Sequence, residues 1–214
     1  MGSLLNDILC AARADSIPEA QSGLWRVNKI RIDGTWSIRE GKKIFLPAGT
    51  YTYLHRYTDS TLHVGGETVM EDTPFELRHH LNFMLRAKGN VLITGLGLGC
   101  VVRGLLVNPR VEHITCLEIS KNVIDLVEPY MPKERLKIIH TDALKWTETD
   151  KRKFHYAWHD IWADPDNGQD NLNLLHAKLL MNCQKKVEFQ GAWHVPRWYK
   201  KIIPINYIGK KRAI

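Results

Sequence analysis

The sequence has few cysteines, no acidic bias and no long hydrophobic run. None of its apolar stretches approaches the roughly 20 residues that span a bilayer, so no transmembrane segment is expected. The four cysteines lie far apart and form no Cys-x-x-Cys pair, which predicts reduced thiols rather than disulfides or a zinc site. The first residues lack the basic, apolar and small-residue order of a secretory signal. These absences predict a cytoplasmic protein without membrane contact.

Positive charge is in excess and is unevenly distributed. The chain has 214 residues and a net charge of +7, and 44% of its residues are hydrophobic, which is enough for one well-packed main domain. The segment 185–214 holds eight lysines or arginines and one acid, Glu188. For this basic, tryptophan-containing segment two interpretations stay open: a contact with nucleic acid, and an ordinary solvated surface. A contact in a homodimer is a further hypothesis for its aromatic part.

An N-terminal arm or helix at 1–24 and a small antiparallel β unit at 25–72 are expected first along the chain. The β unit is predicted by short runs of β-branched and aromatic residues that are separated by turn residues. Asp33-Gly34 separates two such runs, which predicts a hairpin over 25–38. Further strands are expected at 50–57 and 61–64.

An α/β pattern begins at Thr73-Pro74-Phe75-Glu76. Thr73 can cap a helix, proline fits the first helical position, and Glu76 completes a capping box. Apolar strands and helices then alternate, with strands expected at 90–94, 111–119, 135–140, 155–160 and 187–190. This alternation predicts a Rossmann-like parallel sheet covered by helices over 73–185, with a C-terminal segment at 186–214.

Three acidic or glycine-rich positions follow successive strands. The loop Thr94–Gly99 joins a strand to a helix, where glycines let the backbone approach a ligand, although they also suit a tight turn. Glu118 ends the second strand about 20 residues later, where an acid can accept hydrogen bonds from both hydroxyls of a ribose. Asp142-Ala143 follows the third strand, at the depth of an adenine edge, and capping the next helix is its alternative role. Together they indicate a bound nucleoside.

Residues 91–99, 111–119 and 138–143 resemble class I S-adenosylmethionine-dependent methyltransferases. The glycines follow the spacing GxGxG rather than the GxGxxG of dinucleotide-binding folds. Within the superfamily the sequence is most similar to spermidine synthases, over residues 61–164. The resemblance implies that the donor is S-adenosylmethionine or decarboxylated S-adenosylmethionine. The resemblance, with the residues that end the fourth strand, predicts nine cofactor-binding residues. They are Gly95, Gly97, Gly99, Glu118, Ile119, Asp142, Ala143, Asp160 and Trp162.

Asp160, at the end of the fourth strand, is the candidate catalytic residue. Aminopropyltransferases carry an Asp-Ser-Ser-Asp-Pro stretch at this place, and its first aspartate handles the attacking amine. Here one extra residue separates Asp160 from Asp164, and Ile161 and Trp162 replace the serines. A carboxylate at this position can orient or deprotonate a nucleophile, or hold an ammonium group. Trp162 is expected either to stack on a ring of a ligand or to belong to the core.

No metal site is predicted. His155 and His159 lie four residues apart on a strand, and His79 and His80 are neighbours on a helix, but no carboxylate or cysteine completes a site at ligand spacing. These histidines are interpreted as packed core or surface residues.

Methyl transfer from S-adenosylmethionine to an unidentified small-molecule acceptor is the favoured function. Aminopropyl transfer to a polyamine is the first alternative, although the region around Asp160 offers few acids for a polycation. A non-catalytic module that binds nucleotide or nucleic acid is the second. About 29 residues follow the helix expected to end near 185, so the sheet is expected to be shortened after its fifth strand.

Overall fold

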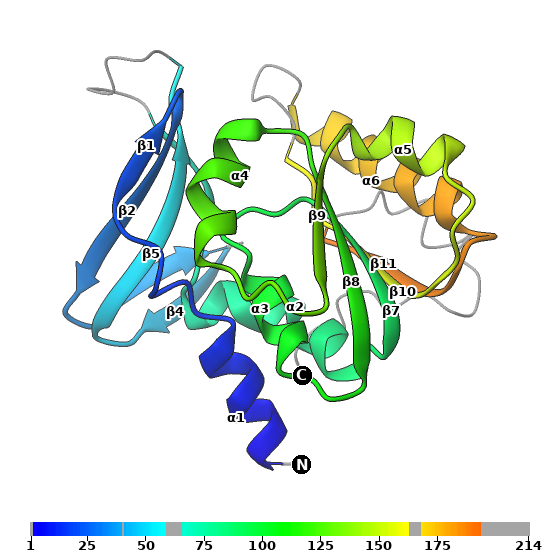
Figure 1. The fold of residues 1–214 in the computed structure, drawn as a ribbon. Helices are drawn as coiled ribbons and strands as arrows, with labels where there is room; N and C mark the ends of the chain where they lie inside the picture. Colours follow the sequence, from blue (N-terminus) through cyan, green and yellow to red (C-terminus); the bar gives the residue numbers. More distant parts are fainter. Residues whose placement is uncertain (1, 40, 59–65, 163–167, 194–214) are drawn as a thin grey trace.

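The computed structural model describes residues 2–39, 41–58, 66–162 and 168–193. A helix, α1 (Gly2–Ala11), precedes an antiparallel β unit, and the rest of the described chain forms an α/β core (Figure 1). Within these ranges, no helix combines the length and the apolar character that crossing a membrane requires.

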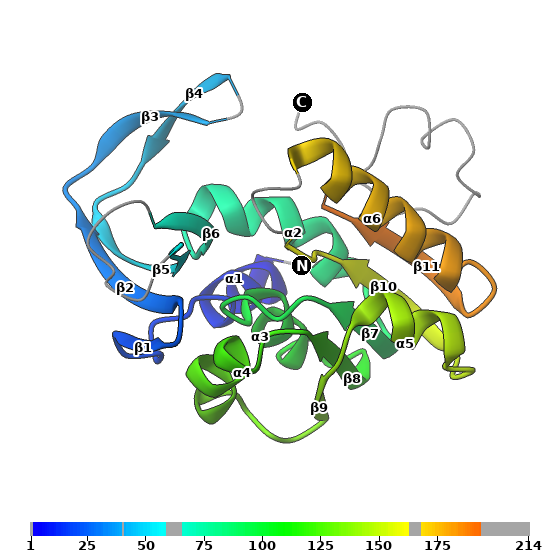
Figure 2. The same ribbon diagram turned by 90° about the horizontal axis from the view of Figure 1, so that it is seen from above.

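The β unit contains one four-stranded antiparallel sheet and one separate two-stranded ribbon. The sheet has the order β1-β2-β5-β6, and the ribbon pairs β3 with β4. Figure 2 shows the ribbon continuing beyond the end of the β2–β5 pair. The bounds of the strands are Ala20–Ser22 (β1), Trp25–Ile32 (β2), Thr35–Arg39 (β3), Lys42–Leu46 (β4), Gly49–Arg56 (β5) and Glu67–Glu71 (β6).

The predicted hairpin over 25–38 is wrong. Strand β2 pairs along its whole length with β5, from Trp25 opposite Arg56 to Ile32 opposite Gly49, while β3 pairs with β4. Gly34 has a φ of +83°, a conformation open to glycine, so the chain leaves one sheet here and enters the other. The chain therefore changes direction at Asp33-Gly34, but the two strands on either side of this turn do not pair with each other. The strand expected at 61–64 lies outside the described residues.

The core is a five-stranded, wholly parallel sheet with the order β11-β10-β7-β8-β9. The predicted fold class, a Rossmann-like α/β sheet beside a small antiparallel β unit, is confirmed. The elements of the core are α2 (Pro74–Arg86), β7 (Gly89–Thr94), α3 (Cys100–Leu106), β8 (Val111–Glu118), α4 (Lys121–Val127), a 3-10 turn (Glu128–Tyr130), β9 (Leu136–His140), α5 (Ala143–Thr149), β10 (Phe154–His159), α6 (Gly168–Cys183) and β11 (Val187–Ala192).

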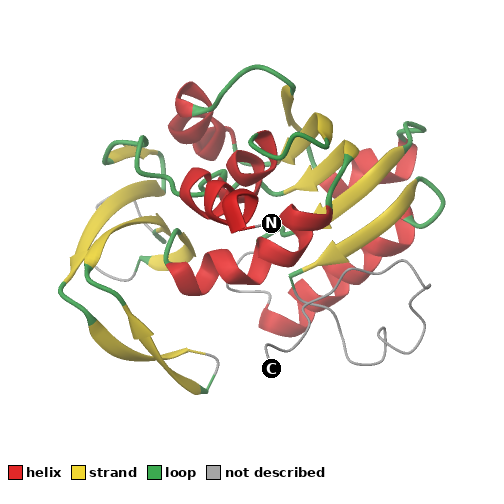
Figure 3. Cartoon of the chain, turned by 90° about the horizontal axis from the view of Figure 1, so that it is seen from below, coloured by secondary structure: helices red, strands yellow, loops and turns green. Residues whose placement is uncertain are grey.

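Both faces of the parallel sheet are buried. Successive residues of a strand point to opposite faces, and in β7 Val91 and Ile93 join the larger core cluster with α1 to α4, whereas Leu92 joins the cluster under α5 and α6. Figure 3 shows helices on both sides of the sheet. This two-sided burial is why β7 is an uninterrupted apolar run in the sequence.

Side-chain caps begin several core helices. Thr73 Oγ1 accepts a hydrogen bond from the Glu76 amide, at 3.4 Å, and Ser120 Oγ accepts one from the Val123 amide, at 3.3 Å. The predicted cap at Thr73 is thus confirmed. Helix α5 begins after Asp142, in agreement with the capping role that the sequence left open for this residue.

Candidate functional site

A cavity of about 510 Å³ lies between the β unit and the carboxyl ends of the parallel strands. Strands β7 to β10 end at this cavity. A glycine loop follows β7, and an acid ends or follows each of the other three strands. The opposite wall comes from the β unit and includes Trp25, Leu54, Arg56 and Met70. Adjacent strands β7 and β10 are a switch point of the sheet, where the chain connections leave in opposite directions, and such points form ligand crevices in open α/β sheets.

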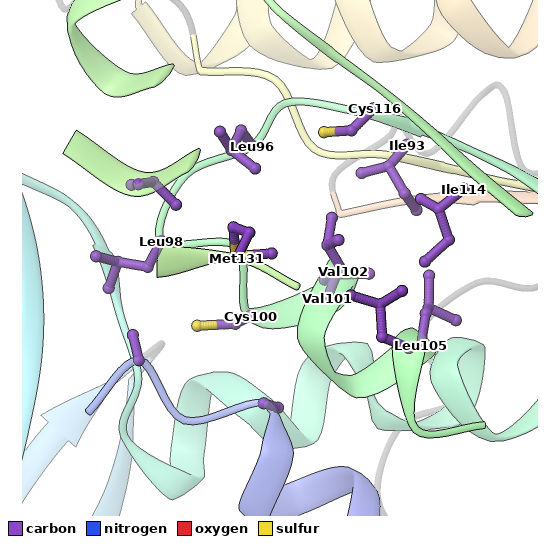
Figure 4. Close-up of a cluster of buried hydrophobic side chains, with 14 of the residues drawn as sticks. Ile93, Leu96, Leu98, Cys100, Val101, Val102, Leu105, Ile114, Cys116 and Met131 are labelled. Carbon is purple, nitrogen blue, oxygen red and sulfur yellow. The ribbon is translucent and has the colours of Figure 1, made fainter. Parts of the chain in front are cut away.

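The glycine loop after β7 packs tightly against its surroundings. Gly95 has a φ of +92°, and a Cβ atom there would lie 2.0 Å from the carbonyl oxygen of Asp160. A Cβ atom on Gly97 would lie 2.4 Å from Met70 Sδ, which also accepts a hydrogen bond from the Leu98 amide at 3.2 Å. Figure 4 shows Leu98 of this loop beside the start of α3. The loop needs glycine for both its conformation and its clearance.

Glu118 joins the end of β8 to the glycine loop. Its Oε2 accepts a hydrogen bond from the Leu96 amide, and its Oε1 accepts one from the Ser120 amide, both at 2.8 Å. The side chain is buried and lines the cavity. Burial raises the pKa of Glu118, and the backbone N–H donors oppose this rise. A carboxylate held on both oxygens by the backbone is a rigid acceptor for hydroxyl groups of a ligand.

Asp142 takes the helix-capping role that its sequence position allows. Its Oδ1 caps α5 by accepting hydrogen bonds from the amides of Leu144, at 2.8 Å, and Lys145, at 3.4 Å. Asp142 also lines the cavity. Its neighbour Ala143 lines the cavity too, as does Ile119, which follows β8. Capping therefore fixes the orientation of a carboxylate that faces the site.

Asp160 lies directly against the glycine loop. Its amide donates to the Thr94 carbonyl at 2.9 Å, and its carbonyl contacts Gly95. Its carboxylate lies 3.8 Å from His80 Nε2, and both Asp160 and Trp162 line the cavity. Asp164, by contrast, is outside the described residues, as is the basic segment from 194 onward.

The structure brings together eight of the nine predicted cofactor-binding residues on one cavity wall: Gly95, Gly97, Glu118, Ile119, Asp142, Ala143, Asp160 and Trp162. Gly99 is the exception. It takes the N-cap position before α3 with a φ of +73° and packs on Met131. Its role in the structure is therefore one of packing.

The sequence predicted only a capping role for Glu76 and a packing role for His80, and it placed neither residue at the site. Glu76 lines the cavity, and its Oε1 lies 3.5 Å from His80 Nε2. Burial by itself would raise the pKa of Glu76, but hydrogen bonds from His79 and His80 outweigh it and lower the pKa to about 2. The spacing of four residues on one helix was the available signal, because it places both side chains on the same helical face.

His159 forms a buried polar link under the site. Its ring is fully buried, with Nδ1 at 3.2 Å from Thr94 Oγ1 and Nε2 at 3.4 Å from Gln190 Oε1. Gln190 in turn donates to the Leu180 carbonyl at 2.9 Å. Burial lowers the pKa of His159 to about 3. The imidazole is therefore neutral in the folded protein and joins β7, β10 and β11.

Acid is expected to destabilise the protein through His159. Its pKa is about 3 in the folded protein and about 6.5 when the ring is exposed to water, so the unfolded chain binds the extra proton between these values. From neutral pH to pH 5, the free energy of unfolding should fall by about 2 kcal/mol from this residue alone. Urea unfolding of wild type and His159→Gln at both pH values measures it. An equally steep loss in His159→Gln would contradict the assignment.

Comparison with known proteins finds that the chain is similar to polyamine aminopropyltransferases. No family model matches the chain. Polyamine aminopropyltransferase from Buchnera aphidicola subsp. Acyrthosiphon pisum is 31% identical over 112 residues, which are 49% of this chain and 38% of that protein. The same enzyme from Clostridium botulinum is 31% identical over 109 residues, 48% of this chain and 37% of that protein. The predicted resemblance to aminopropyltransferases is confirmed.

Solved structures that are similar to this chain include two types of transferase. Spermidine synthase from Thermotoga maritima has 15% identity and a TM-score of 0.45, over 80% of this chain and 62% of that one. A putative RNA methyltransferase from Pyrococcus horikoshii has 14% identity and a TM-score of 0.41, over 54% of each chain. The chain spans less than two fifths of the length of the curated relatives described above.

Proposed function

We propose that this chain binds S-adenosylmethionine and transfers its methyl group to a small-molecule acceptor. The observation that carries the proposal is the carboxylate of Glu118, which is fixed between the amides of Leu96 and Ser120 at the cavity wall. Such a carboxylate suits the two hydroxyls of a ribose. Asp142 would then face the adenine, and the backbone around Gly95 and Gly97 would pass the amino-acid part of the donor.

The charges at the cavity favour S-adenosylmethionine over its decarboxylated form. Arg56 is the only lysine or arginine among the described residues that line the cavity. The amino-acid tail of S-adenosylmethionine carries a carboxylate that this guanidinium can bind, and the decarboxylated form has none. Of the lining acids, Glu118 and Asp142 are assigned to the nucleoside, and Asp160, which lies against the glycine loop, is assigned to the acceptor.

The reaction needs little chemistry from the protein. The sulfonium makes its own methyl carbon electrophilic, and the chain has to align a nucleophile behind that carbon and exclude water. Asp160 is assigned to orient the nucleophile and to take its proton. Its backbone contacts with Thr94 and Gly95 hold this carboxylate next to the loop that receives the donor.

Calorimetry tests the donor site directly. S-adenosylmethionine and S-adenosylhomocysteine are each titrated into the full chain, and both are expected to bind at micromolar to submillimolar concentration, the range typical of enzyme substrates. No heat of binding for either compound at millimolar concentration would rule the proposal out. Methylthioadenosine, which has the nucleoside without the amino-acid tail, serves as the reference ligand.

Aminopropyl transfer is the second candidate, and the similarity to polyamine aminopropyltransferases favours it. In that reaction the donor is decarboxylated S-adenosylmethionine and the nucleoside product is methylthioadenosine. Incubating the chain with this donor and putrescine, and measuring methylthioadenosine by chromatography, decides between the candidates. Formation of methylthioadenosine in a putrescine-dependent manner would replace methyl transfer as the proposed function.

Loss of Arg56 is expected to weaken the binding of the donor tail selectively. In Arg56→Gln the affinity for S-adenosylmethionine should fall about tenfold, as expected for one charge-assisted contact worth about 1.4 kcal/mol, while the affinity for methylthioadenosine stays the same. Arg26→Gln is the matched control, because Arg26 lies on neighbouring β2, is exposed and does not line the cavity. Equal losses for both ligands would refute a contact with the tail.

A further inference from the structure

His80 lies between two acids of the cavity wall without lining the cavity itself. Its side chain is fully buried, and its Nε2 lies 3.5 Å from Glu76 Oε1 and 3.8 Å from Asp160 Oδ2. Both acids line the cavity. The three groups therefore form a row, carboxylate, imidazole and carboxylate, in which the imidazole is shielded from solvent and both ends reach the site.

Several elements fix the geometry of this row. Glu76 and His80 face the same side of α2 because they are four residues apart. Asp160 is held by its backbone bond to Thr94, and the ring of Trp158 from β10 meets the His80 ring at 5.7 Å with an angle of 88° between planes. The imidazole is thus packed in one orientation, with the same nitrogen close to both acids.

The neighbouring charges favour an N–H at His80 Nε2 that stabilises both carboxylates of the row. Glu76, with a pKa of about 2, is ionised at neutral pH. His79 Nδ1 lies 3.7 Å from the other oxygen of Glu76. From α3, Cys100 faces the same region, and burial raises the pKa of its thiol well above the ordinary value, so the thiol is neutral. A charged imidazolium at His80 would have both carboxylates close to its Nε2.

We propose that Glu76, His80 and Asp160 act as one unit, in which Asp160 takes the proton of the acceptor and His80, held by Glu76, keeps Asp160 ionised and in place. This inference rests on the proposed function. It assigns a role to Glu76 and His80, and makes His80 a positioning residue that acts through Asp160.

The step balances without any further reactant. The nucleophile forms a bond to the methyl carbon, the carbon–sulfur bond breaks, and its electron pair returns to sulfur. The proton of the nucleophile passes to Asp160 Oδ2, whose ionised form is stabilised beforehand by the N–H of His80 Nε2, 3.8 Å away. The proton later leaves to solvent.

Titration of His80 by NMR tests the unit. The chain contains ten histidines, and in protein labelled with ¹³C at histidine Cε1 the signal of His80 is the one lost in His80→Gln. Its pKa should fall by about one unit or more in Glu76→Gln and again in Asp160→Asn, because each variant removes an opposite charge within about 4 Å of the ring. His113, exposed on β8, is the internal control.

A histidine that only fills space would stay neutral and would not respond to either acid. An unchanged His80 titration in either variant, or no titration in wild type, would overturn the inference. Calorimetry with S-adenosylmethionine keeps the two proposals apart. Donor binding together with an uncoupled His80 removes this inference alone, whereas failure of donor binding removes the proposed function and this inference together.

Discussion

Gly95→Ala is expected to cause the largest loss of stability of any single substitution in the glycine loop. The new Cβ would lie 2.0 Å from the carbonyl oxygen of Asp160, and the φ of +92° is one that alanine rarely adopts. Backbone atoms cannot yield as a flexible side chain can, so β7 and β10 would have to separate at their carboxyl ends. We expect the free energy of unfolding to fall by about 3 kcal/mol or more, the sum of backbone strain and overpacking.

Gly41→Ala separates the two causes of this loss. Gly41 also has a positive φ, of +73°, but a Cβ there would find no atom within 4 Å. Only the strain of the left-handed conformation applies, which costs about 1–2 kcal/mol. Urea unfolding of both variants measures the difference. Equal losses in Gly95→Ala and Gly41→Ala would show that the contact with Asp160 does not limit this position.

Glu118→Ala is expected to abolish most of the affinity for the donor. Under the proposed function two ribose hydroxyls lose a charged acceptor, and each such hydrogen bond contributes about 1.5–3 kcal/mol. The affinity for S-adenosylmethionine should therefore fall about 100-fold or more in calorimetry. The amides of Leu96 and Ser120 lose their acceptor as well, so the loop itself should loosen.

Two comparisons sharpen this test. Glu112→Ala removes an exposed acid at the opposite end of β8 and should leave donor binding unchanged. Because burial raises the pKa of Glu118, protonation should weaken binding at a higher pH than an ordinary glutamate would. In Glu118→Gln this dependence should disappear. Normal donor affinity in Glu118→Ala would remove the residue from the site.

The parallel core was predictable because its local signals agree with one another along the chain. A short apolar run that leads into glycines, such as 90–94, favours a strand that is buried on both faces, and the cap at Thr73 indicates where α2 begins. Parallel strands also end at one edge of the sheet, so acids that follow them had to converge. Glu118, Asp142 and Asp160 meet at one cavity for this reason.

The pairing of the β unit and the role of His80 could not be predicted in the same way. Asp33-Gly34 identifies a turn, but which strand pairs with β2 depends on contacts with β5, which begins well beyond that turn. His80 is next to Asp160 only because α2 packs across the end of β10, a contact that no local pattern encodes. Both features depend on contacts between residues that are far apart in the sequence.

The cavity has walls from two different sheets, and this has a thermodynamic consequence. Met70 of β6 touches the glycine loop after β7, so a ligand between them would contact the antiparallel and the parallel sheet at once. A ligand that binds only the folded form stabilises whatever it holds together, in proportion to the logarithm of its concentration. Melting of the β unit and of the core would then merge into a single cooperative transition whose midpoint rises with the amount of ligand.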